Sequence, residues 1–196
     1  MLRRWGCRTL NLVHRALCRS GWWKKTLEAH VLPWVLDGVD LGANVLEVGP
    51  GPGLTTDLLR TRATRLTCVE IDSALAGSLS RRLTGLNVTV LNEDATQMPL
   101  PNATFDGAVS FTMLHHVPSA ALQDRLLAEV ARVLRPGGIF AGTDSRYSRM
   151  FGLLHLFDTM VVVDPRTFPK RLEAAGFTDV RVDTNEYAFR FRARRG

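Results

Sequence analysis

The hydrophobic positions of the chain form two alternating patterns, short continuous apolar runs and longer segments with helical spacing. The continuous runs suit strands that are buried on both faces, and they occupy residues 44–48, 66–71, 87–91, 107–111 and 138–143. The segments with helical spacing lie between these runs, at residues 54–62, 73–84 and 119–134. Strands that alternate with helices of this length predict a parallel sheet with helices on both faces.

The end of the chain has a different pattern. Residues 176–196 alternate apolar and polar positions on either side of Thr184 and Asn185. This alternation predicts an antiparallel hairpin at one edge of the sheet. Together with the five apolar runs, the hairpin predicts a doubly wound α/β fold with a mostly parallel, seven-stranded sheet.

The basic residues gather at the two ends of the chain, whose net charge is +6. Residues 1–27 contain seven basic residues and no acid, and residues 190–196 add four arginines. Apolar positions 10, 13 and 17 predict an amphipathic helix in the first segment. We favour a helix that belongs to the domain over a cleaved presequence, because the segment lacks the serine enrichment of transit peptides. Binding to a membrane surface is a third interpretation.

The composition changes this picture little. A chain of 196 residues, 45% hydrophobic and 22% charged, is typical of one soluble globular domain. No apolar stretch approaches the about 20 residues that a membrane-spanning helix needs. Cys7, Cys18 and Cys68 are widely spaced and form no CxxC pair, which argues against a disulfide framework or a metal site. We expect a cytoplasmic protein in a reducing compartment, without a metal.

The stretch "VLEVGPGPGL", residues 45–54, joins the first predicted strand to the first predicted helix. Open α/β sheets bind their ligands at such turns, at the carboxyl ends of the strands. Gly49 would allow a sharp turn, Gly51 a close approach of the backbone to a ligand, and Gly53 tight packing of the helix. A tight turn without a ligand is the alternative. The dinucleotide motif GxGxxG does not fit in either register, because Leu54 and Thr56 stand where it needs glycine.

The motif present is ExGxGxG, from Glu47 to Gly53, and it resembles motif I of the class I S-adenosylmethionine-dependent methyltransferases. "VEID" after the second strand, "NEDATQMPLP" after the third, "FDGAVSFTMLHHV" and "EVARVLRPGGIFAGTDS" resemble the small-molecule enzymes of this family that are related to ubiquinone and menaquinone biosynthesis. The resemblance covers residues 40–185. It implies a Rossmann-like methyltransferase fold and S-adenosylmethionine as the cofactor.

The resemblance also implies a set of cofactor contacts. Glu47 would lie near the ammonium group of the cofactor, and Glu70 would accept hydrogen bonds from both ribose hydroxyls. Asp94 would face the adenine amino group, with the backbone of Ala95 beside the ring. The remaining predicted contacts come from the loop glycines and from Ile71 and Phe111.

Several of these acids have a purely structural alternative. Glu70 or Asp72 could cap the helix that begins at Ser73, since acids favour helix N-termini; we assign Glu70 to the cofactor and Asp72 to the cap. Asp94 could start a turn. Glu129 and Arg132, three positions apart on one helix, are interpreted as a solvated ion pair.

Methyl transfer needs alignment, a dry cleft and, for a protonated oxygen or nitrogen acceptor, a base. Candidates for a catalytic role are His115 and His116 after the fourth strand and Asp144 after the fifth. The alternative is that these histidines are packed structural residues. Candidates for the acceptor pocket are Tyr147, His155 and Asp158, which lie where the family inserts substrate-specific structure; ordinary helix packing is the alternative for all three.

The sequence therefore predicts a methyltransferase that acts on an oxygen, nitrogen or carbon atom of a small, fairly apolar acceptor. Residues 1–40, with Trp5, Trp22, Trp23 and Trp34, would form a helical lid on the cofactor-binding domain of residues 41–196. A nucleic-acid methyltransferase that uses the basic ends is the second hypothesis. It is disfavoured for exocyclic amines, because Ser110 to Met113 do not match the motif [DNS]PP[YFW]. A protein that binds the cofactor without turnover is the third.

Overall fold

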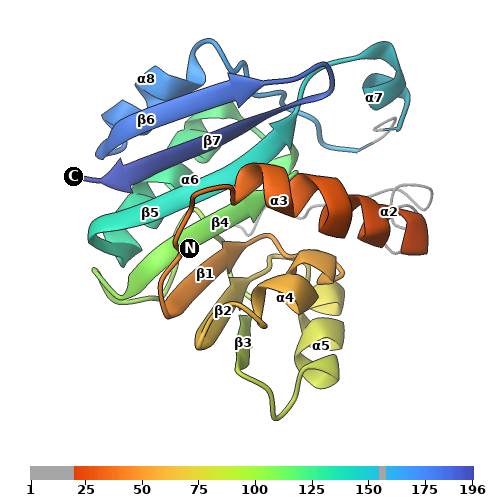
Figure 1. Ribbon diagram of the computed structural model, residues 1–196, viewed down its shortest axis with the longest axis vertical. Helices are drawn as coiled ribbons and strands as arrows, with labels where there is room; N and C mark the ends of the chain where they lie inside the picture. The colour runs from red at the N-terminus through yellow and green to blue at the C-terminus, as the bar shows by residue number, and fades with distance from the viewer. Residues whose placement is uncertain (1–19, 155–157) are drawn as a thin grey trace.

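The computed structural model describes residues 20–154 and 158–196, and they form one sheet covered by helices (Figure 1). The strands are β1 (Asn44–Val48), β2 (Arg65–Val69), β3 (Val88–Leu91), β4 (Phe105–Phe111), β5 (Leu134–Ser145), β6 (Phe177–Thr184) and β7 (Ala188–Arg195). The helices are α2 (Gly21–Thr26), η1 (Leu27–Val31), α3 (Leu32–Val35), α4 (Leu54–Leu59), α5 (Ser73–Arg82), η2 (Leu114–His116), α6 (Ala120–Val133), α7 (Arg149–Leu154) and α8 (Phe168–Ala174).

The seven strands are ordered β3-β2-β1-β4-β5-β7-β6 in the described part of the chain. Strands β1 to β5 pair in parallel, and β7 pairs antiparallel with both β5 and β6. The predicted doubly wound fold with its C-terminal hairpin is therefore confirmed. Because the parallel strands all end at the same edge, the loops after β1 to β4 meet there.

One boundary differs from the sequence prediction. The apolar pattern ends the helix at residue 134 and begins the next strand at residue 138, but β5 already begins at Leu134, which pairs with Phe105 of β4, so the tetrapeptide "RPGG" lies within the strand. The strand absorbs this tetrapeptide because Gly137 adopts a φ of 75°, which L-residues with side chains rarely adopt.

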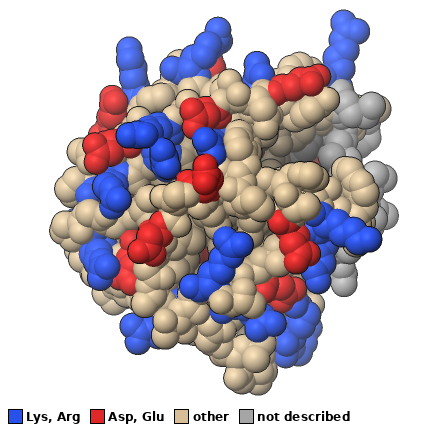
Figure 2. All heavy atoms as spheres, in the orientation of Figure 1, with Lys and Arg blue, Asp and Glu red and all other residues tan. Residues whose placement is uncertain are grey.

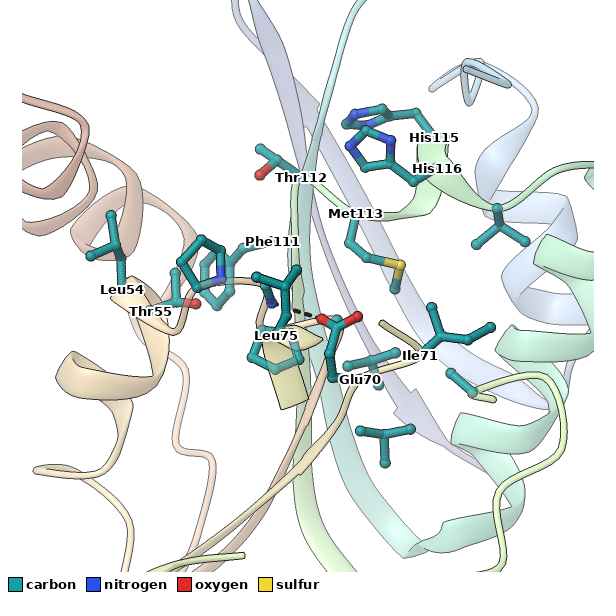
Figure 3. Close-up of a pocket in the computed structure, with 18 of the residues that line it drawn as sticks. Leu54, Thr55, Glu70, Ile71, Leu75, Phe111, Thr112, Met113, His115 and His116 are labelled. Carbon is teal, nitrogen blue, oxygen red and sulfur yellow. Dashed lines mark hydrogen bonds between the residues drawn. The ribbon is translucent and has the colours of Figure 1, made fainter. Parts of the chain in front are cut away.

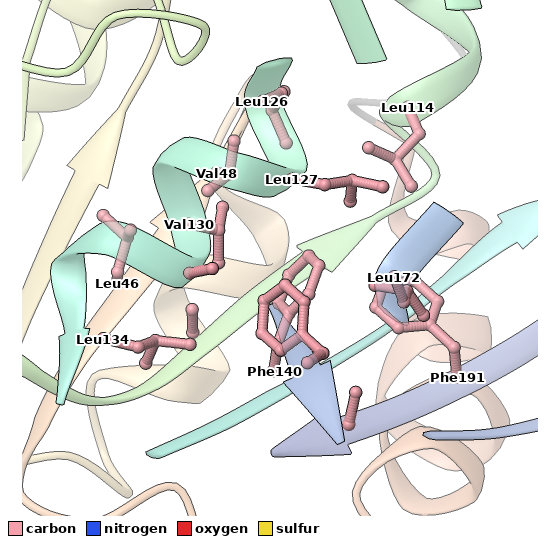
Figure 4. Close-up of a cluster of buried hydrophobic side chains, with 14 of the residues drawn as sticks. Leu46, Val48, Leu114, Leu126, Leu127, Val130, Leu134, Phe140, Leu172 and Phe191 are labelled. Carbon is pink, nitrogen blue, oxygen red and sulfur yellow. The ribbon is translucent and has the colours of Figure 1, made fainter. Parts of the chain in front are cut away.

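Two hydrophobic cores lie on the two faces of the sheet. Figure 4 shows the larger, in which Phe140 and Phe191 of the sheet pack against residues of α6 and α8, such as Val130 and Leu172. The smaller core packs η1, α3 and α4 on the opposite face, with Leu32 at 1% exposure. In Figure 1 α3 to α5 lie in front of the sheet, and α6 and α8 lie behind it.

Helices α2, η1 and α3 form one continuous helical run with a π turn in its middle. The N–H of Leu32 donates to the carbonyl of Leu27, five residues back, and both side chains are buried. The extra residue in the turn keeps both leucines on the face toward the core. This run is thus part of the fold, whereas the amphipathic helix predicted around positions 10 to 17 lies outside the described residues.

Candidate active site

A cavity of about 340 Å³ lies at the carboxyl ends of the parallel strands (Figure 3). Its lining residues that follow β1 to β4 include Gly49, Pro50, Gly51, Pro52, Glu70, Ile71, Glu93, Asp94, Ala95, Thr96, Thr112, Met113, His115 and His116. In the view of Figure 3, Glu70 and the two histidines lie at opposite ends of this group, with Met113 between them. Glu70, Asp94, His115 and His116 therefore surround one cavity, at the edge where such sheets bind ligands.

The loop after β1 is shaped by its first two glycines. Gly49 adopts a φ of 67°, and a Cβ on it would lie 2.2 Å from Cγ of Met113. Gly51 adopts a φ of 56° and has nothing within 4 Å of the place where a Cβ would lie. Since both residues line the cavity, Gly49 permits the turn and Gly51 presents bare backbone to the hollow.

Gly53 does not line the cavity; it allows α4 to pack closely against α5. It precedes α4 with a φ of 86°, and a Cβ would lie 2.3 Å from Cδ1 of Leu79 and 2.7 Å from a guanidinium nitrogen of Arg82. Arg82 donates to both carboxylate oxygens of Asp57, at 2.7 and 2.8 Å, and at longer range to the carbonyls of Pro52 and Gly53. Helix α5 thus fastens the end of the glycine loop, a role that nothing in the motif indicated.

Glu70 connects the loops after β1 and β2. Its carboxylate accepts hydrogen bonds from the backbone N–H of Gly51 and of Asp72, both at 2.9 Å. The side chain is 6% exposed, and burial raises the pKa of its carboxyl. The cap of α5 is supplied by Asp72, which accepts from the N–H groups of Ala74 and Leu75, as expected.

Glu47 lies behind the glycine loop and is not among the residues that line the cavity. Its two carboxylate oxygens accept from the hydroxyls of Thr55 and Thr56, and the thiol of Cys68 donates to it over 3.5 Å. Burial raises the pKa of its carboxyl, and burial also raises the pKa of the Cys68 thiol. The structure therefore shows Glu47 holding the start of α4 against β1 and β2.

Asp94 both turns the chain and lines the cavity. Its carboxylate accepts from the N–H of Thr96 at 2.8 Å, which forms the turn considered from the sequence. The predicted ion pair of Glu129 and Arg132 is present, with Nε of Arg132 2.7 Å from the Glu129 carboxylate, but it is only partly exposed and both residues also bind the loop between β3 and β4. Glu129 accepts from the N–H of Met98, and Arg132 donates to the carbonyls of Met98 and Leu100. The hydrogen bond from Arg132 lowers the pKa of the Glu129 carboxyl.

Of the catalytic candidates, His115 and Asp144 are buried, and His116 beside them is half-buried. Nδ1 of His115 lies 2.5 Å from Asp144, which also accepts from the backbone N–H of His115 at 3.0 Å and of Ser145 at 2.6 Å. Nδ1 of His116 lies 3.2 Å from the carbonyl of Thr159. Since the Asp144 carboxylate and the Thr159 carbonyl are acceptors, Nδ1 donates in both rings. Both histidines line the cavity and Asp144 does not.

Gln123 of α6 fixes the position of this group, and sequence reasoning missed it. The side chain is 1% exposed, and its amide nitrogen donates to the carbonyls of Leu114 and Val161. The N–H of Val161 in turn donates to the carbonyl of His115 at 2.7 Å. A glutamine on the buried face of a predicted helix was the one available signal, because buried polar groups need partners.

Helices outside the strand-to-helix loops supply part of the apolar wall of the cavity. Trp22, Trp23 and Leu27 contribute from α2 and η1, and Phe151 contributes from α7. Of the predicted pocket residues, Tyr147 and Asp158 do not line the cavity, and His155 lies outside the described residues. Phe151, an apolar residue within the same segment, lines it instead.

Two of the four tryptophans assigned to the lid give the lid no support in the structure. Trp34, assigned to the lid, lies beside Arg190, whose guanidinium is 5.5 Å from the ring centre. Trp5 lies outside the described residues.

In the part of the chain that the structure describes, no cluster of side chains could hold a metal ion, and no helix is long and apolar enough to cross a membrane.

The strand order and the cavity at the carboxyl edge define a class I methyltransferase fold. Residues 46–142 match the family model described as "Methyltransferase domain". The chain carries a domain of the class I S-adenosylmethionine-dependent methyltransferases, as the sequence motifs predicted.

Two relatives come from Mycolicibacterium smegmatis. One, named probable S-adenosylmethionine-dependent methyltransferase, is 33% identical over 99 residues, which are 50% of this chain and 37% of the relative. The other, named fatty-acid O-methyltransferase, is 37% identical over 107 residues, 54% of this chain and 38% of the relative. This chain therefore spans well under half the length of both relatives.

Solved structures of the same fold cover most of the chain. A SAM-dependent methyltransferase from Aquifex aeolicus superposes with a TM-score of 0.70 at 24% identity, covering 87% of this chain and 92% of its own. The N-methyltransferase NodS from Bradyrhizobium japonicum, solved with S-adenosyl-L-homocysteine, gives a TM-score of 0.70 at 17% identity and covers 94% and 93%. At these identities the similarity concerns the fold.

Proposed function

We propose that this chain transfers the methyl group of S-adenosylmethionine to a small, fairly apolar acceptor. The observation that carries the proposal is a single cavity in which the glycine loop and Glu70 face an apolar wall and two histidines. A hollow of about 340 Å³ is in the size range of small-molecule sites, which are mostly apolar with a few placed polar groups.

The residues present fit the cofactor. Gly51 leaves open space where any side chain would project, so the backbone can approach a bound molecule. Glu70 stands after β2, where an acid binds ribose hydroxyls in nucleotide-binding sheets, and Asp94, Ala95, Ile71 and Phe111 border the same hollow. We assign Glu47 to the support of the loop, since its oxygens already accept from two threonines.

When bound, the cofactor supplies an activated methyl group on a sulfonium sulfur. The chain has to align the acceptor, keep water out and receive a proton where the acceptor carries one. Nε2 of His115 or His116 is the proton acceptor in this proposal. Asp144 would hold the His115 ring in a fixed orientation, as a buried carboxylate does for histidine in other enzymes.

The tryptophans of α2 and Leu27 would close the acceptor side of the cavity as a lid, within one domain formed with residues 41–196. An apolar acceptor agrees with this wall and with the relative named fatty-acid O-methyltransferase. Membership of the ubiquinone and menaquinone group stays a prediction, as does the nucleic-acid alternative.

Calorimetric titration with S-adenosylhomocysteine, with NADH as the control ligand, tests the cofactor assignment. We expect binding of S-adenosylhomocysteine alone. Transfer of a radiolabelled methyl group to dodecanoic acid, a substituted phenol and an aromatic amine then tests turnover. No binding would overturn the proposal, whereas binding without transfer to any acceptor class would favour a protein that has lost turnover.

A further inference from the structure

Two elements that wall the cavity also carry the most exposed apolar side chains near it. Trp22 lines the cavity and is nevertheless 66% exposed, so it marks the place where the hollow meets solvent. Across the cavity, Phe151 of α7 lines the wall, and its neighbours Tyr147 and Leu153 are 65% and 64% exposed. In Figure 1 α2 and α7 lie at the same end of the molecule.

The same two segments are basic. Lys24 and Lys25 on α2, Arg146 before α7 and Arg149 on α7 are exposed. The acid nearest to them in the sequence of α2 and η1 is Glu28, which is also exposed, and residues 145–153 contain no acid.

 The sequence of residues 1–19, next to α2, adds five arginines and no acid. On the right of Figure 2, the side that carries α2 and α7 in Figure 1, Lys and Arg side chains project from the surface, and Asp and Glu side chains lie near some of them. We call the exposed residues Trp22, Lys24, Lys25, Arg146, Tyr147, Arg149 and Leu153 the basic rim.

The chemistry of the basic rim fits one kind of partner. Exposed tryptophan and tyrosine prefer the boundary between water and hydrocarbon, where an apolar body and a polar tip are both satisfied, and an exposed leucine prefers the hydrocarbon itself. The four basic residues outnumber the one acid beside them, Glu28, and exposed lysines and arginines are attracted to anionic headgroups. Nucleic acid would account for the charges but gives Leu153 no partner, because its contacts are made mainly to phosphates and bases.

We propose that the basic rim docks the opening of the cavity onto an anionic lipid membrane. An apolar acceptor would then pass from the bilayer into the cavity along Trp22 and Phe151, without crossing water. The docking itself does not depend on catalysis, and only this route for the acceptor rests on the proposed function.

Sedimentation of the full chain with sucrose-loaded vesicles tests the docking. We expect binding to vesicles of phosphatidylglycerol and phosphatidylcholine at low salt, and little binding to phosphatidylcholine alone. The double variant Lys24→Glu/Lys25→Glu should weaken the binding at least about tenfold, given the attraction of each basic residue to an anionic surface. Trp22→Ala/Leu153→Ser should weaken it several-fold, because apolar contact with the bilayer is lost.

Matched controls lie elsewhere on the surface. Arg62→Glu/Lys170→Glu makes the same change in net charge at two exposed residues away from the basic rim, and Tyr187→Ala removes a ring that is 73% exposed. Both should bind the vesicles like the unchanged protein. Neither lysine of the basic rim lines the cavity, so Lys24→Glu/Lys25→Glu should keep its affinity for S-adenosylhomocysteine, which also reports correct folding.

The possible outcomes separate the two proposals. No binding to the anionic vesicles, equal binding to neutral vesicles, or equal losses in the control and basic-rim double variants would each overturn the docking. Binding to a single-stranded RNA oligonucleotide but not to the vesicles would overturn it in favour of a nucleic-acid partner. Failure of S-adenosylhomocysteine to bind would remove the proposed function and leave the vesicle result standing.

Discussion

The two halves of the cavity are built in different ways. On the side that we propose for the cofactor, called the cofactor half below, Gly49, Gly51 and Glu70 come from the loops after two neighbouring strands, and the backbone N–H of Gly51 donates to Glu70. On the acceptor side, the histidine turn is held by Asp144 of β5, Gln123 of α6 and Val161. The first half is a local motif that packs against itself, and the second depends on partners that are distant in the sequence.

This difference predicts which measurements each half controls. Changes in the cofactor half should alter the affinity for S-adenosylhomocysteine. Changes in the acceptor half should alter stability and turnover and leave that affinity almost intact.

The largest effect is expected for Gly49→Ala. The new Cβ would overlap Met113, and the φ of 67° disfavours any side chain. The affinity for S-adenosylhomocysteine should fall about a hundredfold or more, equivalent to about 2.7 kcal/mol, measured by calorimetry.

Gly85→Ala is the matched control, because Gly85 has a φ of 81° and open space around its Cβ position. It should lose about 1–2 kcal/mol of unfolding free energy through backbone strain and keep its affinity. Wild-type affinity in Gly49→Ala would show that the loop is only a turn.

Asp144→Asn should act on the other half. The new amide group would place a donor among three N–H groups that now donate to the carboxylate. The unfolding free energy should fall by about 2 kcal/mol, because a buried hydrogen-bonding group loses its partner, as measured by denaturant titration.

The folded variant should bind S-adenosylhomocysteine within about a factor of two of the wild type, a difference of less than about 0.5 kcal/mol. Asp124→Asn serves as the control, since Asp124 pairs with Arg171 at the surface and such pairs contribute little. A large loss of cofactor affinity in Asp144→Asn would contradict the division into two halves.

The difference between the two halves of the cavity also explains which residues the sequence could predict. The strands and the hairpin follow from apolar runs, and the turn at Gly49 and Gly51 follows from a motif that spans few residues, so local patterns suffice for these. Phe151, Gln123 and Arg82 escaped prediction because their roles come from contacts with elements far along the chain. In the segment after β5, polarity favoured Tyr147 and Asp158, yet the packing of α7 brings Phe151 to the cavity.

Glu70→Gln should reduce the affinity for S-adenosylhomocysteine about tenfold, or about 1.4 kcal/mol, because the amide nitrogen would face a backbone N–H. Burial raises the pKa of Glu70, and ribose hydroxyls would donate to its ionised form. The affinity of the wild type should therefore fall as the pH decreases through this raised pKa, and the variant should lack that component. Titrations over a pH series measure both.

Glu47→Gln provides a matched comparison with the same change in charge. The Glu47 carboxyl accepts from Thr55 and Thr56 and does not line the cavity, so its loss should lower the melting temperature more than the affinity. A loss of affinity as large as that of Glu70→Gln would instead restore the direct ammonium contact that the family resemblance implies.

The smallest effect is expected for Arg82→Ala, which asks whether the cofactor half is truly self-contained. Arg82 fastens the carbonyls of Pro52 and Gly53 to Asp57, but its side chain is 43% exposed. Solvent weakens such contacts to about 1 kcal/mol or less, so the affinity for S-adenosylhomocysteine should fall about two- to fourfold. Arg81→Ala, on the neighbouring residue of α5, should leave it unchanged. If both variants bind like the wild type, the glycines alone fix the loop, and the cofactor half needs no support from α5.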